Sequence, residues 1–356
     1  MGFPELPPSM LACQLLKFHE PYAIHHIPVP SRLDPYDILI KVAVTAFCHT
    51  DAMVSANLMK DTQLPITASH EGCGTVVAVG SSVHSFHVGD RVLAGIPRNR
   101  CGTCADCTSP QEQYCENRTG GIGMQVDGAF AEYLVADSRN GCQLPDNLDF
   151  VNAAPLACAG ITAWRGLLEA ELSKGQVLGI VGSGGGLGHL LIEFAKAQGL
   201  IVVGVDVRDE GLQLSQEAGA SLVLDAREGT EAVTRKIMEF TGGVRAAATI
   251  NLSEAKTAAG LACSITAKHG RMIQIAQPNE ICIPYREIIF RDIHVSGSLT
   301  SSRKQMQDMV EFVAKHRILV KTNVYHGLNN IPMLVADFHG GKMKGKGVVV
   351  VDATQL

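Results

Sequence analysis

The stretch VLGIVGSGGGLG, residues 177–188, decides the fold of the central part of the chain. Its first half, Val177–Val181, is a short apolar run typical of a buried strand, and glycines follow it at once. The next residues place Leu190, Leu191 and Phe194 at helical spacing, and a second apolar run, Leu200–Val205, comes after that helix. A strand, a tight turn, a helix and a second strand in this order predict a βαβ unit with parallel strands.

The same alternation continues towards residue 298. A helix is predicted at Leu212–Ala218, and further strands at Ser221–Leu224, Ala246–Ile250 and Arg271–Ala276. Such a series predicts an α/β fold with a doubly wound parallel sheet, here over residues 159–298.

The two flanking regions have a different pattern. Before residue 158, valine-rich runs are separated by proline and glycine, and strands are predicted at Ile38–Ala46, Gly74–Val79, Arg91–Ala94 and Ala129–Val135. After residue 299, we predict an amphipathic helix at Ser302–His316 and a last strand at Val348–Val351. Residues 1–158 and 299–356 should therefore form one β-rich domain, into which the α/β domain is inserted.

The glycine-rich turn predicts a dinucleotide site. The usual G-x-G-x-x-G spacing fails because Ser183 stands at its first glycine, but Gly182, Gly185 and Gly188 form G-x-x-G-x-x-G. Asp206 ends the next strand, where a carboxylate binds both ribose hydroxyls and repels a 2′-phosphate, so NAD is expected. Arg208 leaves NADP open as an alternative, with a contact to the adenine edge or to solvent as its other interpretation.

Four cysteines form a compact cluster with the spacing C-x2-C-x2-C-x7-C. They are Cys101, Cys104, Cys107 and Cys115. Four thiolates complete a tetrahedral zinc site and leave no position for a substrate, so this zinc would be structural. An iron–sulfur cluster is the rival interpretation. A DNA-reading zinc module is another, although the segment has neither basic residues nor a recognition helix.

Three further stretches hold possible metal ligands. They are Cys48-His49-Thr50-Asp51, His70-Glu71 and Cys158-Ala159-Gly160-Ile161-Thr162. Each alone is a weak signal, because a free cysteine is commonly a small buried apolar residue. Their order along the chain, with the four-cysteine cluster between them, resembles the zinc-containing alcohol dehydrogenases of the medium-chain dehydrogenase/reductase superfamily. The resemblance covers essentially the whole chain and is closest to the shorter, tetrameric yeast-type branch.

This resemblance implies a GroES-like catalytic domain beside the Rossmann-type domain, and it assigns roles to the residues of the scattered stretches. Cys48, His70 and Cys158 would bind a catalytic zinc, because two cysteines, one histidine and an open fourth position are the family's known ligand set. Glu71 would be an alternative ligand, and Asp51 would accept a hydrogen bond from the ligand histidine. Thr50 would take the alcohol proton. His49 would contact the cofactor pyrophosphate.

The resemblance also implies two zinc ions per chain and a set of further cofactor contacts. Zinc would stabilise the deprotonated alcohol, which then gives hydride to the nicotinamide. Lys346 would replace an arginine that holds the pyrophosphate. The remaining contacts would come from the glycine turn and from residues along the nicotinamide: Gly186, Leu187, Ile275, Gln277, Ser298 and Thr300.

The chain departs from the ethanol-active members of the family at its substrate pocket. Met53 stands where those members have the histidine of a proton relay. Met59 stands near the position of a tryptophan that narrows their pocket. Ile96-Pro97-Arg98 replaces a second aromatic residue, and the only tryptophan, Trp164, is expected in the core. Methionine side chains are flexible, so we expect a wider pocket. Arg98 would add polarity to it or lie on the surface, and Gln277 would also add polarity.

Three functions remain open at this point. The first is an alcohol dehydrogenase or carbonyl reductase that acts on a small molecule bulkier than ethanol. The second keeps the fold and the cofactor but reduces a conjugated C=C bond or an iminium, which needs no proton relay. The third is a zinc-binding protein without enzymatic activity.

Composition excludes several partners. The net charge of −5 provides no basic field for nucleic acid or an anionic membrane, and no apolar run reaches the length of a membrane span. We interpret Lys342, Lys344 and Lys346 as a solvated loop, with a cofactor phosphate as the alternative contact for one of them. The chain has eleven cysteines, four of them clustered as in a metal site, and it lacks a signal pattern. Both features predict a cytoplasmic protein. The resemblance implies a homo-oligomer, either a tetramer or a dimer.

Overall fold

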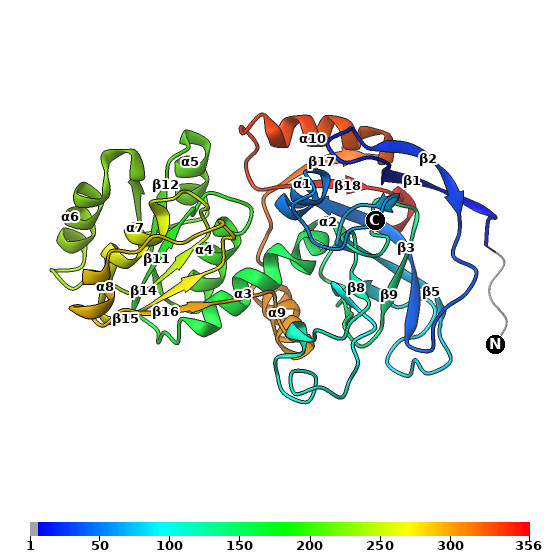
Figure 1. Ribbon diagram of the computed structural model, residues 1–356, viewed down its shortest axis with the longest axis horizontal. Coiled ribbons are helices and arrows are strands. Elements are labelled where there is room, and N and C mark those ends of the chain that lie inside the picture. The colour runs from blue at the N-terminus through cyan, green and yellow to red at the C-terminus, as the bar shows by residue number, and fades with distance from the viewer. Residues whose placement is uncertain (1–5) are drawn as a thin grey trace. The chain divides into compact units, whose positions relative to one another are not determined.

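The computed structural model describes residues 6–356, and the chain divides into two compact units (Figure 1). The first unit contains the described residues up to Ile161 together with Ser301–Leu356. The second unit is the continuous segment Thr162–Thr300. No helix among residues 6–356 is both long enough and apolar enough to cross a bilayer.

The second unit is built on a six-stranded parallel sheet with the order β13-β12-β11-β14-β15-β16. Its strands are β11 Val177–Val181, β12 Ile201–Asp206, β13 Leu222–Asp225, β14 Ala246–Asn251, β15 Thr266–Gln274 and β16 His294–Gly297. The order reverses at β11, because β12 and β13 lie on one side of it and β14 to β16 on the other. The predicted doubly wound parallel sheet is therefore confirmed.

Helices connect these strands, and they pack in two groups. The helices are α3 Ala159–Glu169, α4 Gly188–Ala197, α5 Asp209–Glu217, η3 Ala226–Glu228, α6 Thr230–Phe240, α7 Ala258–Ile265 and α8 Tyr285–Ile289. α4 contacts α5 and the β11–β12 region, whereas α6 contacts α7, which packs on β11 and β14. Right-handed crossovers that start in opposite directions from β11 put the two groups on opposite faces of the sheet.

The first unit contains a seven-stranded sheet whose central strand is β3, Asp37–Phe47. Every residue of β3 except Lys41 is buried, as its nearly continuous apolar sequence predicts. β3 pairs in antiparallel register with three neighbours. The other strands of this sheet are β5 Glu71–Val79, β6 Arg91–Leu93, β9 Tyr133–Asp137, β10 Cys142–Gln143, β17 Thr322–His326 and β18 Lys346–Val350.

Two smaller sheets and several helices complete the first unit. The small sheets are formed by β1 Ser9–Leu15, β2 Ala23–Pro28 and β4 Ile66–Thr67, and by β7 Pro97–Arg98 with β8 Gly120–Gly121. The helices are α1 His49–Ser55, η1 Glu112–Tyr114, α2 Phe150–Ala153, η2 Ala154–Ala157, α9 Arg303–His316, η4 Leu328–Asn330, α10 Ile331–His339 and η5 Ala353–Gln355.

Some predicted boundaries were wrong. The predicted strand Ala129–Val135 begins only at Tyr133, since Phe130 accepts a hydrogen bond from Cys13 N of β1 and donates one to Ala68 O, outside the large sheet. Strand β15 begins five residues earlier than predicted, because Thr266 pairs with Ala246 before a bulge. Both differences depend on partners that are distant in the sequence, and local composition does not report them.

Candidate functional site

The three glycines of the G-x-x-G-x-x-G pattern after β11, at positions 182, 185 and 188, have different structural tasks. Gly182 has φ +83°, a backbone conformation that residues other than glycine rarely adopt. A Cβ on Gly188 would lie 2.4 Å from the carbonyl oxygens of Gly182 and Ser183, so this glycine permits α4 to start against the turn. A Cβ on Gly185 would approach only the Gly182 oxygen, at 3.4 Å. These are the tasks expected of a turn that admits a pyrophosphate at its middle glycine.

Asp206 is bound to the same turn by its carboxylate. One oxygen accepts a hydrogen bond from Gly184 N at 2.9 Å, and the other accepts from Val207 N and Arg208 N at 2.8 and 3.0 Å. Arg208 donates to Gly184 O at 3.1 Å. The position of Asp206 in the sequence predicts a contact with the cofactor, and in the structure its carboxylate also supports the glycine turn.

Gly184 is the glycine that sequence analysis missed. A Cβ there would lie 2.0 Å from the carbonyl oxygen of Gly211 in α5, so the backbones of turn and helix touch. Gly211 is 27 residues further along the chain, and neither residue alone signals this contact.

Substitution of the two adjacent glycines should separate packing from binding. We expect Gly184→Ala to lower the free energy of unfolding by about 1–3 kcal/mol, because the methyl group must displace α5. Gly185→Ala should change it by less than about 0.5 kcal/mol, since the position is open. The latter variant should instead weaken dinucleotide binding. Denaturant unfolding and a fluorescence titration measure the two effects, and equal loss of stability in both variants would contradict this assignment.

The other predicted cofactor residues of the second unit lie after the ends of strands β15 and β16. Ile275 and Gln277 follow Gln274, and Ser298 and Thr300 follow Gly297. Ile275 and Ser298 are buried, whereas Gln277 is exposed. Because all strands are parallel, these residues lie at the same edge of the sheet as the glycine turn and Asp206. Ligands of open α/β sheets bind at this edge.

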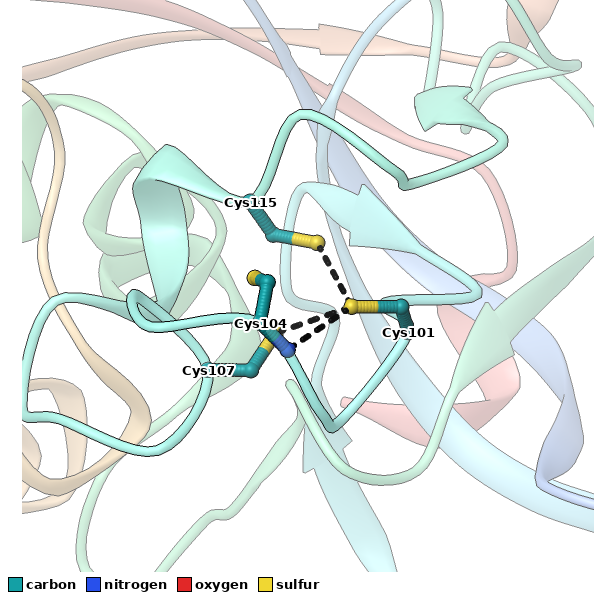
Figure 2. Close-up of side chains that lie close together, drawn as sticks. All are labelled: Cys101, Cys104, Cys107 and Cys115. Atoms are coloured by element: carbon teal, nitrogen blue, oxygen red, sulfur yellow. Dashed lines mark hydrogen bonds between the residues drawn. The ribbon is translucent and has the colours of Figure 1, made fainter.

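The four clustered cysteines converge in the first unit, as Figure 2 shows. Cys101 Sγ lies 3.9 Å from Cys107 Sγ and 3.7 Å from Cys115 Sγ. Four thiolates around one zinc at 2.3 Å have sulfur separations of about 3.8 Å. The spacing therefore fits a single tetrahedral ion, and a cluster of several iron atoms would need wider separations.

Two buried carboxylates hold the start of the segment that carries the four cysteines, residues 98–115, which we call the cysteine lobe. Arg98 pairs with the buried Asp37 at 2.7 Å, and Asn99 N donates to the buried Asp137 at 3.0 Å. Arg139 also pairs with Asp137, at 2.6 Å. The guanidinium of Arg98 is engaged in this ion pair, which sequence analysis did not predict, and a contribution of Arg98 to the polarity of a substrate pocket stays a prediction.

Removal of one cluster cysteine should affect metal content and stability together. Cys101→Ala should lose about one metal ion per chain and melt at a lower temperature, because a closed structural site contributes folding energy directly. Cys282→Ala is the control, since Cys282 is exposed and lies in the other unit. Elemental analysis and thermal melting measure both quantities, and an unchanged metal content in Cys101→Ala would rule out the site.

The scattered candidate ligands also meet in one place. Cys48 follows β3, His70 precedes β5, and Cys158 follows η2. Side-chain ligand atoms of Cys48, His70, Glu71 and Cys158 all lie within 4.8 Å of one another. A hydrogen bond with the Cys158 thiol lowers the pKa of Cys48 well below its ordinary value. This mixed sulfur, nitrogen and oxygen donor set fits zinc.

Asp51 joins two of these segments from inside the protein. Its carboxylate accepts hydrogen bonds from Cys48 N at 2.8 Å and Ser69 N at 3.0 Å, and it lies 3.7 Å from His70 Nδ1. Asp51 is fully buried, and desolvation raises its pKa to about 6. His70 Nδ1 has no hydrogen-bond partner within 3.5 Å among the described residues. The ring therefore faces Asp51 with Nδ1, which leaves Nε2 for a metal.

The two residues after Cys48 differ in exposure. Thr50 Oγ1 lies 3.9 Å from Cys48 Sγ, so its hydroxyl is next to the candidate metal ligands. His49 is exposed, and its ring lies 6.4 Å from that of Phe338. These positions are compatible with a proton acceptor at Thr50 and a cofactor contact at His49.

Lys346 occupies a different environment from the one expected for a solvated loop. Its amino group is buried, and it donates to Phe47 O at 2.9 Å and lies 2.9 and 2.7 Å from the two carboxylate oxygens of Glu71. The solvated-loop interpretation is therefore wrong for this lysine. A contact with the pyrophosphate stays a prediction, and it would compete with these bonds.

Comparisons with known proteins agree with this architecture. Residues 34–146 match the alcohol dehydrogenase GroES-like domain, and residues 186–315 match the zinc-binding dehydrogenase family. An alcohol dehydrogenase of Geobacillus stearothermophilus is 33% identical over 346 residues, which is 96% of this chain and 98% of that protein. An alcohol dehydrogenase of Rhizobium meliloti is also 33% identical, over 96% of this chain and 98% of its own length.

A solved structure supports the same relationship. The alcohol dehydrogenase of Aeropyrum pernix superposes with a TM-score of 0.87 at 27% identity, over 96% of this chain and 99% of that one. The chain belongs to the zinc-binding alcohol dehydrogenase family of the medium-chain dehydrogenase/reductase superfamily, and it is an oxidoreductase. Membership of the yeast-type tetrameric branch stays a prediction.

Proposed function

We propose that this protein is a zinc- and NAD-dependent oxidoreductase that interconverts an alcohol bulkier than ethanol with its aldehyde or ketone. The convergence of Cys48, His70 and Cys158 beside Thr50 carries this proposal. A lone structural metal site would not require a hydroxyl next to an incomplete set of ligands. The relatives named alcohol dehydrogenase add support at 33% identity.

The residues of the site divide the work as follows. Cys48, His70 and Cys158 would hold the zinc, which supplies Lewis-acid polarisation of the substrate oxygen when it is bound. Asp51, whose carboxylate lies 3.7 Å from His70 Nδ1, would orient the imidazole by its charge, and Thr50 would accept the alcohol proton. NAD is the expected cofactor because the Asp206 carboxylate stands where a 2′-phosphate would otherwise be bound.

The environment of Thr50 determines how the proton leaves. Met53 is half-buried on the same helix, and its thioether is too weak an acceptor to pass a proton outward. Met53 would therefore give the proton of Thr50 no onward path, and either water or a histidine from elsewhere in the protein would have to accept it. We expect alcohol oxidation to be slow near neutral pH as a consequence.

Two observations support a substrate larger than ethanol. Flexible methionine side chains stand at both pocket positions, 53 and 59, and Met59 is only partly buried where it packs against Leu15, Val54 and Ile66. Trp164 lies in the core of the second unit with its ring 5.7 Å from that of Phe194, so it does not compensate within the first unit.

A second function keeps the fold and the cofactor but reduces a conjugated C=C bond or an iminium. Met53 favours it, because such a reaction needs no path for an alcohol proton. The convergence of all three expected zinc ligands, Cys48, His70 and Cys158, favours the first function. None of the eleven cysteines forms a disulfide bond, which supports a reducing compartment such as the cytoplasm.

An aromatic enal should separate the two reactions in one assay. We expect NADH-dependent conversion to the allylic alcohol, with kcat/KM about tenfold or more above that for acetaldehyde, because added apolar contacts fill the wider pocket. A zinc chelator should abolish turnover, and added zinc should restore it. Formation of the saturated aldehyde would favour the second function, and chelator-resistant turnover would rule out catalytic zinc.

Replacement of Asp206 by glycine should relax the choice of cofactor. It frees the N–H groups of Val207 and Arg208 for a 2′-phosphate and removes a repelling charge. We expect the ratio of kcat/KM for NADPH to that for NADH to rise by about tenfold or more. The variant also loses the hydrogen bond from Gly184 N to Asp206, so its melting temperature is compared with that of the wild type to detect any loss of stability. A wild-type enzyme that already prefers NADPH would contradict the assignment of Asp206.

A further inference from the structure

Glu71 is a candidate ligand whose carboxylate already forms an ion pair with another buried side chain. Oε1 accepts hydrogen bonds from Ala159 N at 3.2 Å and from Lys346 Nζ at 2.9 Å, and Oε2 lies 2.7 Å from the same amino group. Glu71 is fully buried, and Lys346 is nearly so. Neither charge has solvent as an alternative partner.

The backbone fixes both members of this pair. Ala46 of β3 pairs with Glu71 of β5 on one side and with Val348 of β18 on the other. The bond from Lys346 Nζ to Phe47 O attaches the lysine to the residue before Cys48. The amino group is therefore held beside the candidate metal ligands by two strands and a hydrogen bond.

Lys346 is the buried cation that pairs with the charge of Glu71, whereas the carboxylate of Asp51 is bound by the backbone N–H groups of Cys48 and Ser69. Two thiolates, from Cys48 and Cys158, would neutralise a zinc dication, and Lys346 neutralises Glu71. Without Lys346, a buried carboxylate would remain with no partner of opposite charge except the metal, and an unpaired buried charge is costly. The four candidate ligand groups lie within 4.8 Å of one another, so a small rotation of Glu71 would reach the ion.

We propose that Lys346 is a positioning residue that holds Glu71 away from the metal and thereby keeps the fourth coordination position open for substrate. This inference rests on the proposed catalytic zinc. Glu71 then serves as a ligand in reserve, and its release from Lys346 would close the site. The proposal gives Lys346 a function in the first unit that does not depend on any contact with the cofactor.

The open position can be measured without turnover. Co²⁺ substituted for zinc reports added ligands by its visible absorption, and imidazole binds only where a coordination position is free, so the closed four-cysteine site is silent. In Lys346→Met, Glu71 should occupy the open position in most molecules. The dissociation constant of imidazole should then rise by about tenfold or more, in inverse proportion to the fraction of molecules whose position stays open.

Three variants make this test specific. The double variant Lys346→Met with Glu71→Gln should regain wild-type imidazole affinity, because the amide neither carries charge nor competes strongly for the metal. Lys342→Met, an exposed lysine of the same segment, should behave as wild type. Glu71→Gln alone should leave imidazole affinity within about threefold of wild type, because Glu71 is not a ligand at rest. This last variant tests the inference even if Lys346→Met does not fold.

The outcomes distinguish the inference from the function on which it rests. Unchanged imidazole affinity in Lys346→Met, or affinity about tenfold tighter in Glu71→Gln, would overturn the role of Lys346 while leaving catalytic zinc intact. A wild-type protein that binds Co²⁺ only at the four-cysteine site would contradict the proposed function itself, and the role of Lys346 would fall with it.

Discussion

The antiparallel pairing of β3 with β5 and β18 is the constraint on which the candidate active site depends. This buried strand ends at Phe47, so Cys48 emerges at its edge, and Ala46 pairs with Glu71 on one side and Val348 on the other. The two pairings bring residues near positions 48, 71 and 346 to one point without any flexible connection. A shift of one residue in either register would reverse the faces of the side chains and remove Glu71 or Lys346 from the site.

Buried charges fix the details that strand pairing leaves open. Asp51 binds the backbone of Cys48 and of Ser69, so the two ligand-bearing segments share one carboxylate. Asp37 and Asp137 act in the same way on the start of the cysteine lobe. In each case a buried carboxylate is bound by a backbone N–H or a guanidinium, and loss of that partner would leave the carboxylate with less compensation for its burial. The first unit is therefore rigid where its chemistry requires fixed geometry.

In the second unit, the glycine turn must leave backbone N–H groups accessible while the strands beside it stay packed. The reversal of strand order at β11 leaves the turn after this strand at the carboxyl edge of the sheet. Asp206 secures the turn from one side, and the contact of Gly184 with Gly211 secures it from the other. Of Gly182, Gly184, Gly185 and Gly188, Gly185 has the most space for a side chain, so the turn is packed at its ends and more open in its middle.

The sequence alone determined those features whose residues are close together in the chain. The parallel sheet followed from alternating apolar runs, the glycine turn from its position after Val181, and the four-cysteine site from its spacing, because local geometry joins residues only a few positions apart. The second ligand set was recognised only by resemblance, since positions 48, 70 and 158 carry no shared periodicity. The pairing of Arg98 with Asp37, the approach of Gly184 to Gly211 and the burial of Lys346 against Glu71 were decided by tertiary structure. Each joins segments 27 to 275 residues apart, whose contact depends on strand order and register.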